Sequence, residues 1–299
     1  MPPPLPMTPA RRVTLVIGVP VALAIIGLVA LDMVANVGQA SLRVDRAFAA
    51  PDHQVRVTID NPDVTLRSTA GSGTGVRVTG TLRGSFVPPA FRVRPTAAGV
   101  AISSHCVAWI GSCSGVLTLT AAAGLSVKVS DSSGDLSASG IRGHVTMSAG
   151  SGDLSAAGLS GTISLDDGSG DITASGLSGR DVRVNDSSGD ISVSGLSGDG
   201  VHLNDGSGEI VVTGLAETDV TGRSGSGDVT LRFTTVPRRV TITDGSGNIT
   251  LVLPRGPAYY QVDASSSAGN RSVSVKTRPS SPYVITATAD SGNVSVSYG

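Results

Sequence analysis

Aromatic side chains are scarce in this sequence: they make up 3% of its 299 residues, and charged side chains make up 15%. A core with so few rings must be thin, and enzymes that cleave polysaccharides on a parallel β-helix need gathered acids and bases, usually with aromatic platforms. The four histidines are scattered: His53, His105, His144 and His202. The sequence has neither a G-x-S-x-G nucleophile elbow nor a phosphate loop ending in GK[ST]. We therefore expect a protein that is not an enzyme.

Net positive charge is also missing, because the formal net charge is -1. Residues 1–100 carry ten Arg against five Asp, whereas residues 131–249 carry 16 Asp and Glu against seven Arg. A surface that binds nucleic acid needs a basic stripe, which this acidic region lacks. We therefore expect no nucleic acid partner.

Glycine is abundant, with 39 copies, and one short phrase containing it recurs from Asp131 to Asn293. It begins as DSSGDL and returns in variants such as AGSGDL, DGSGDI, DGSGEI and DGSGNI. The steps between successive copies are 18, 18, 19, 19, 19, 20, 22 and 23 residues, as marked by Gly134, Gly152, Gly170, Gly189, Gly208, Gly227, Gly247, Gly269 and Gly292. A period of about 20 residues predicts a solenoid.

Each period contains two short runs in which apolar and polar residues alternate, joined by a corner such as SGLSG at residues 175–179. This pattern predicts an all-β fold, a single-stack parallel β-solenoid whose 18–23-residue coils lie about 4.8 Å apart. One apolar residue per coil should stack into a column: Leu136, Leu154, Ile172, Ile191, Ile210, Val229 and Ile249. Within the predicted solenoid domain, residues 52–299, we expect irregular capping coils over 52–123 and regular repeats over 124–299.

The N-terminal region predicts a membrane anchor. Residues 1–12 are a Pro-rich tail ending in Arg11 and Arg12, and the next 19 residues, 13–31, carry no charge. A helix of that length spans about 28 Å, close to the hydrocarbon core. The positive-inside rule places the tail in the cytoplasm and the solenoid outside the cell membrane, after an anchor over 13–32 and a linker over 33–51. A cleaved signal peptide, with a cleavage site at residues 38–40, is the alternative.

Acidic residues recur at one position of the repeat: Asp135, Asp153, Asp171, Asp190, Glu209 and Asp228. Carboxylates at coil spacing repel one another unless they are capped, screened or bridged by cations, so this row is a candidate calcium site. The motif differs from the GGxGxDxUx calcium roll, and capping of backbone amides explains the same residues without a metal. A second, interrupted row contains Asp131, Asp167, Asp186, Asp205 and Asp244.

Both cysteines, Cys106 and Cys113, lie in the insertion HCVAWIGSC with the single Trp, Trp109. Outside the cytoplasm, such a pair predicts a small disulfide. A metal pair or a catalytic thiol is the alternative, but no further Cys or His cluster accompanies His105.

Three stretches resemble the bacterial DUF4097 adhesin-like family: GVLTLTAAAGLSVKVSDSSGDLSASGIRG, ITLVLPRGPAYYQVDASSSAGN and ITATADSGNVSVSYG. The resemblance covers roughly residues 50–299 and implies a β-solenoid of the cell envelope without catalytic residues. Its expected function is that of a membrane-anchored, non-catalytic binding module whose partner is an envelope polymer or a surface or membrane protein. The alternative is an envelope-stress component that acts through a membrane partner, since the 12-residue tail has no room for a signalling domain.

Overall fold

The computed structural model describes residues 39–299 apart from 51–52, 73, 86–87, 97–98 and 106–112. This part of the chain forms 22 β-strands, and about 74% of the described residues are in strands. No helix within these residues is long and apolar enough to cross a membrane. The predicted tail and anchor, residues 1–12 and 13–32, lie outside the described residues.

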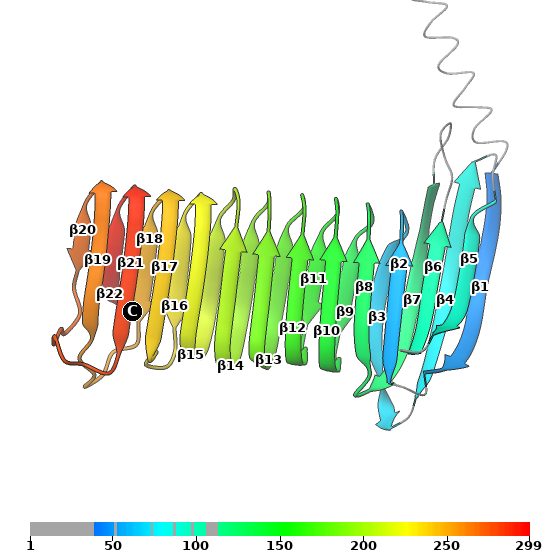
Figure 1. Ribbon diagram of the computed structural model, residues 1–299, viewed down its shortest axis with the longest axis horizontal. Helices are drawn as coiled ribbons and strands as arrows, with labels where there is room; N and C mark the ends of the chain where they lie inside the picture. The colour runs from blue at the N-terminus through cyan, green and yellow to red at the C-terminus, as the bar shows by residue number, and fades with distance from the viewer. Residues whose placement is uncertain (1–38, 51–52, 73, 86–87, 97–98, 106–112) are drawn as a thin grey trace, which may run out of the picture.

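The strands wind into a β-solenoid of about nine turns, which confirms the predicted all-β solenoid (Figure 1). Two rows of strands form its two faces. The first face contains, in spatial order, β5 (Ala90–Thr96), β6 (Gly99–His105), β2 (Gln54–Ile59), β8 (Ser126–Asp131), β10 (Arg142–Ala149), β12 (Ser160–Asp167), the later parts of β13 (Ile172–Asp186), β14 (Ile191–Asp205) and β15 (Ile210–Ser226), and then β17 (Arg239–Ser246), β21 (Val284–Ser291) and β19 (Gln261–Ala268).

The second face is assembled in the same way. It contains, in spatial order, β1 (Gln39–Ala49), β4 (Gly75–Ser85), β7 (Cys113–Ala123), β3 (Asp63–Ser72), β9 (Leu136–Ser139), β11 (Leu154–Ala157), the first parts of β13, β14 and β15, and then β16 (Val229–Phe233), β18 (Ile249–Leu253), β22 (Val294–Tyr298) and β20 (Arg271–Val273).

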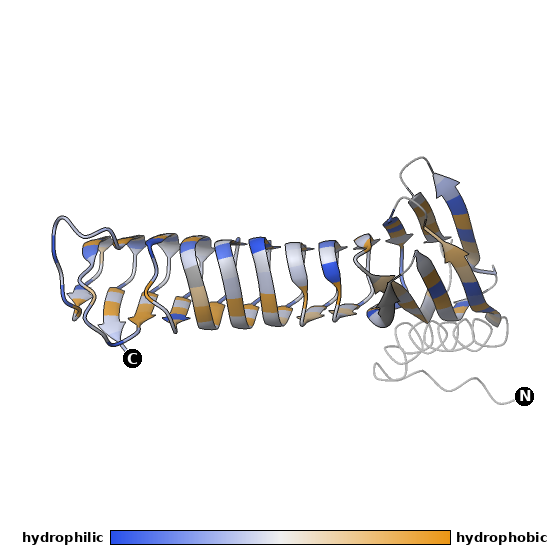
Figure 2. Cartoon of the chain, turned by 90° about the horizontal axis from the view of Figure 1, so that it is seen from below, coloured by the Kyte–Doolittle hydropathy of each residue, from blue (hydrophilic) through white to orange (hydrophobic). Residues whose placement is uncertain are grey.

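The core is a thin layer between the two faces, and Figure 2 shows apolar bands repeating from coil to coil. The predicted column is confirmed: all seven of its residues are at most 1% exposed. Its members are paired in register, as Leu154 is with Leu136 and with Ile172. Each coil thus covers the apolar residues of the next, so the stack rather than the single coil is the stable unit.

The repeated glycines permit the coils to approach this closely. A Cβ atom at Gly189 would stand 1.9 Å from the carbonyl oxygen of Gly170 in the preceding coil, and one at Gly198 would stand 1.7 Å from that of Gly179. No side chain can occupy such a space, so glycine is required at these turns for contact between coils.

The spatial order of the coils departs from the sequence order at both ends. The pair β2–β3 lies between β6–β7 and β8–β9, and the C-terminal pair β21–β22 lies between β17–β18 and β19–β20. Figure 1 shows the latter as the red strand β21 between β19 and β17. The sequence pattern does not specify this order, because an inserted pair presents the same alternation and the same turn as its neighbours.

The section before residue 124 also differs from the prediction. Strands β2, β3, β6 and β7 pair in parallel and extend the solenoid, but β4 and β5 run antiparallel to their neighbours and β1 is antiparallel to β4. The predicted linker 33–51 is therefore corrected over Gln39–Ala49, which form β1. Leu42 and Val44 alternate with Arg43 and Asp45 in the sequence, but two apolar residues among charged ones do not distinguish a strand from a solvated linker.

Candidate functional site

A column of buried acids runs along the first face, at its turn into the second face. Asp167, Asp186 and Asp205 are directly in register, each about 6% exposed, and Asp131 and Asp244 occupy the same column. Ala149 and Ser224 take the same position in two intervening coils. The second, interrupted row of acids expected from the sequence therefore lies inside the fold.

The buried acids close their own turns. Oδ1 of Asp131 accepts a hydrogen bond from the backbone N–H of Ser133 at 3.1 Å, and the same bond recurs from Ser188 to Asp186 and from Ser207 to Asp205. The other oxygen, Oδ2, is buried without a hydrogen-bond partner in Asp131, Asp167, Asp186 and Asp205. Burial raises the pKa of the Asp167 and Asp205 carboxyls to about 6 and also raises those of Asp131, Asp186 and Asp244.

The predicted calcium row lies on the outside, where each turn enters the second face. Its carboxylates cap backbone amides of the neighbouring coil: Asp135 Oδ1 accepts from Asp153 N at 3.0 Å, and Asp171 Oδ1 accepts from Asp190 N at 2.9 Å. The same bonds link Asp153 to Asp171, Asp190 to Glu209 and Asp228 to Asn248. Asn248, Asn293 and Asn270 then continue the row in neutral form. We call this series the outer ladder.

These hydrogen bonds support the capping explanation for the acidic row. In the part of the chain that the structure describes, no group of three or more His, Cys, Asp and Glu side chains is arranged to hold a metal ion. Calcium binding at the row stays a prediction for experiment.

The other residues singled out by sequence are not brought together. Cys113 begins β7, while Cys106 and Trp109 lie outside the described residues, so the disulfide stays a prediction. His105 contacts Asp60. His144 lies on β10 and His202 on β14, three strands apart on the first face.

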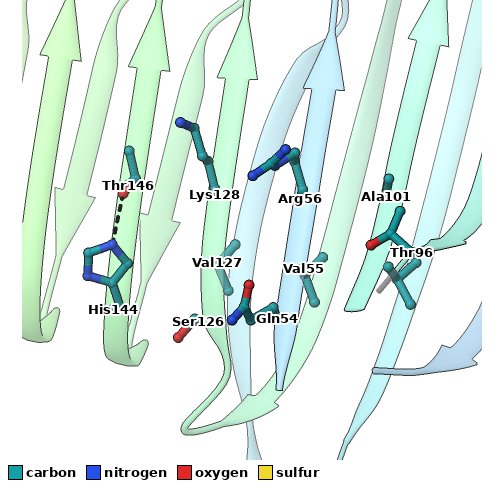
Figure 3. A pocket seen from close by; sticks show the side chains of 11 residues that line it. Gln54, Val55, Arg56, Thr96, Ala101, Ser126, Val127, Lys128, His144 and Thr146 are labelled. Carbon is teal, nitrogen blue, oxygen red and sulfur yellow. Dashed lines mark hydrogen bonds between the residues drawn. The ribbon is translucent and has the colours of Figure 1, made fainter. Parts of the chain in front are cut away.

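The structure instead reveals a groove of about 520 Å³ on the first face, where the solenoid meets β5 and β6 (Figure 3). Strands β2, β8 and β10 contribute most of its lining, and Thr96 and Ala101 border it on the other side. Its polar residues include Arg56, Lys128, His144 and Gln54, and none of its lining residues is acidic. We call this site the basic groove.

Strand register places the cations of the basic groove side by side. Arg56 of β2 pairs with Lys128 of β8 on one side and with Ala101 on the other, and Arg94 of β5 lies opposite Ala101. All three cations are exposed, because they alternate with buried core residues such as Val55, Val57 and Val127. Figure 3 shows the Arg56 and Lys128 side chains on neighbouring strands.

The charges of the basic groove are uncompensated within the described part of the chain. The ion pairs there join other residues and leave Arg56 and Lys128 without a carboxylate. Like charges directly opposite each other on paired strands are destabilising. An anion bound between them would relieve this repulsion.

Sequence reasoning missed the basic groove because its residues are far apart in the chain. Arg56 and Lys128 are 72 positions apart and become neighbours only because β2–β3 is inserted next to β8–β9. Strict alternation in QVRVTI and SVKVSD did indicate that both cations point outward. The sequence did not show that the two strands are paired.

Two of the solved structures that the chain matches are of low similarity. One is titled a "putative cell adhesion protein" from Clostridium sporogenes ATCC 15579, at 8% identity with a TM-score of 0.22, covering 86% of this chain and 100% of that one. The other is titled a "putative adhesin" from Bacteroides fragilis NCTC 9343, at 13% identity with a TM-score of 0.35, covering 86% and 97%. No curated protein matches significantly. The model of the Toastrack DUF4097 family matches residues 126–297, more than half of the chain, and the protein belongs to that family.

Proposed function

We propose that this protein is a non-catalytic binding module of the bacterial cell envelope and that its basic groove binds an anionic polysaccharide. We further propose that residues 13–31 anchor it in the membrane with the solenoid outside the cell. The observation that carries the proposal is the in-register pair of Arg56 and Lys128, two exposed cations on neighbouring strands of a groove without acidic lining.

The shape of the face supports a polymer as the ligand. From Thr146 at the edge of the groove, the first face continues as an open row of polar residues, in which Ser164 and Arg183 follow on successive strands. A flat polar surface of this kind can follow several sugar units, and hydroxyl groups on its side chains can pair with sugar hydroxyls. The two cations would supply the charge contacts at one end of the bound segment.

The test is a titration of the full-length chain, purified in detergent micelles, with dextran sulfate, polygalacturonate and neutral dextran. We expect both anionic polymers to bind, neutral dextran not to bind, and the affinity to fall as salt concentration rises. The double variant Arg56→Gln/Lys128→Gln should bind about tenfold more weakly, because two exposed charge contacts contribute about 1.4 kcal/mol together.

The matched control is Arg223→Gln/Arg239→Gln, which removes the same charge from exposed positions elsewhere on the first face. This control should leave the affinity unchanged. Equal losses in the two double variants would show that binding depends on net charge alone and would contradict the proposed site. Binding of neutral dextran with equal affinity would contradict the proposed ligand class.

A further inference from the structure

The end of the solenoid opposite the basic groove is an open coil. Its strands, β19 and β20, each pair on one side only within the described part of the chain, with β21 and β22 respectively. Val262 and Val273 on these strands are half-buried, although they pack against the core, because no further coil covers them. Just before β19, Tyr260 pairs with Thr277 of the segment that follows β20. The outer edges of β19 and β20 themselves present unpaired backbone groups beside a partly covered apolar layer.

The two ends of the solenoid differ in how their edges are protected. At the groove end, the edge strands are β1, which carries Arg43, Asp45 and Arg46, and β5, which carries Arg92, Arg94 and Pro95. Charged residues and proline are the common means of preventing an edge strand from pairing with another chain. At the open end, β19 reads QVDASSSA, with Asp263 as its one charge, and β20 reads RSV, with Arg271 as its one charge; neither strand contains proline.

The outer ladder also changes character toward the open end. It is acidic as far as Asp228 and then neutral at Asn248, Asn293 and Asn270, in spatial order. The side chain of Asn293 donates to Asn248 Oδ1 at 3.0 Å and accepts at its own Oδ1 from Asn270 N at 2.9 Å. Asn270 ends the ladder, and its exposed side-chain amide has no hydrogen-bond partner among the described residues.

The side-chain amide of Asn270 can pair with the same amide of a second copy of this chain. A carboxamide carries both donors and an acceptor, so two of them related by a two-fold axis can pair, whereas two carboxylates would repel. Stacked Asn side chains stabilise contacts between identical chains in the same way. Pairing through the open end uses the same surface of both copies, and the groove end carries protected edges. The assembly therefore stops at a dimer and does not grow into a fibre.

We propose that two copies of this chain associate end to end through the edges of β19 and β20, in an antiparallel arrangement about a two-fold axis. The pairing extends the β-ladders of each solenoid across the dimer and covers Val262 and Val273. Each basic groove lies roughly 40 Å from the open end, at about 4.8 Å for each strand. The dimer would therefore present one groove at each outer end, and two sites on one polymer raise its avidity.

The experiment measures the mass of the full-length chain in detergent micelles over a range of protein concentrations by sedimentation equilibrium. We expect a monomer–dimer equilibrium. Asn270→Asp should raise the dissociation constant of the dimer at least tenfold, because it places two carboxylates at the contact. Backbone N–H of residue 270 remains bonded to Asn293 in this variant. Ser192→Asp adds the same charge at an exposed position in the middle of the solenoid and should leave the dimer unchanged.

Hydrogen exchange gives a second readout that does not depend on any variant. Backbone amides of residues 261–268 should exchange more slowly as the protein concentration rises, while those of the edge strand β1 should not change. A wild-type chain that stays monomeric throughout would overturn the proposal. So would a dimer that Asn270→Asp and Ser192→Asp affect equally, or one that leaves exchange in β19 independent of concentration.

Discussion

Lowering the pH from 7 to about 5 should increase the folding stability of this protein, because burial favours the protonated form of its buried aspartates. Burial raises the pKa of Asp167 and Asp205 from 3.8 to about 6, and the neighbouring carboxylates of Asp153, Asp186 and Asp190 act in the same direction. A carboxyl whose pKa is higher in the folded chain stabilises the fold fully below about pH 4. That contribution is lost as the pH rises through about 6.

The size of the effect follows from the two pKa values. Between pH 5 and pH 7, a carboxyl with a pKa of about 6 folded and about 3.8 unfolded loses roughly 1 kcal/mol of its contribution. Two such groups give about 2 kcal/mol, which corresponds to a rise of about 4–8 °C in the melting midpoint on going from pH 7 to pH 5. Asp186 lies between them in the column, and burial raises its pKa as well, so it adds to the effect with the same sign.

Thermal unfolding followed by circular dichroism at pH 5, 6 and 7 tests this reasoning. The variant Asp167→Ser/Asp205→Ser should show a smaller pH dependence than the wild-type chain, because it removes two of the buried carboxyls and keeps Asp186; serine is suited to this position, since Ser224 already occupies the same column. Asp199→Ser, which removes an exposed carboxylate, should retain it. A midpoint that falls steadily from pH 7 to pH 5 in the wild-type chain would refute the argument, and so would equal pH dependence in both variants.

The remaining predictions concern the turns, the outer ladder and the cysteines. Gly189→Ala should destabilise the chain by about 3 kcal/mol through overpacking, because its Cβ would stand 1.9 Å from a backbone oxygen. In Gly200→Ala the Cβ would stand 3.6 Å from its nearest neighbour, so urea denaturation should show less than half that loss in the free energy of unfolding. Equal losses in the two variants would argue against close contact between coils at Gly189. Addition of EDTA should leave the melting midpoint unchanged, because outer-ladder oxygens already accept backbone N–H groups; a lower midpoint would favour the calcium row. A disulfide between Cys106 and Cys113 predicts that iodoacetamide adds no mass to the unreduced chain, and labelling of both residues would contradict the pairing.

The repeat could be predicted from sequence because equivalent positions in successive coils have the same structural role. Leucine or isoleucine after the turn enters the core, glycine in the turn permits close contact, and the intervening Ser and Thr stay outside. Alternation with a fixed period therefore identified the solenoid and its apolar column.

Coil order could not be predicted because it depends on which strands pair with each other. The alternation of apolar and polar residues is the same in every coil and does not specify neighbours. Val64 pairs with Leu136, and Ile249 pairs with Val294, across long separations between chemically equivalent coils. The basic groove depends on the first of these insertions, so it too was hidden in the sequence. The two acidic rows were visible, but the exposed and the buried row could be told apart only by the side of the turn on which each lies.

The most direct test of the proposed binding site is a hydrogen-exchange footprint of the full-length chain with and without dextran sulfate. Binding in the basic groove predicts slower exchange in β2 and β8, residues 54–59 and 126–131, and unchanged exchange at the turns of the outer ladder. Protection confined to other strands, or no protection at polymer concentrations that saturate binding, would contradict the account.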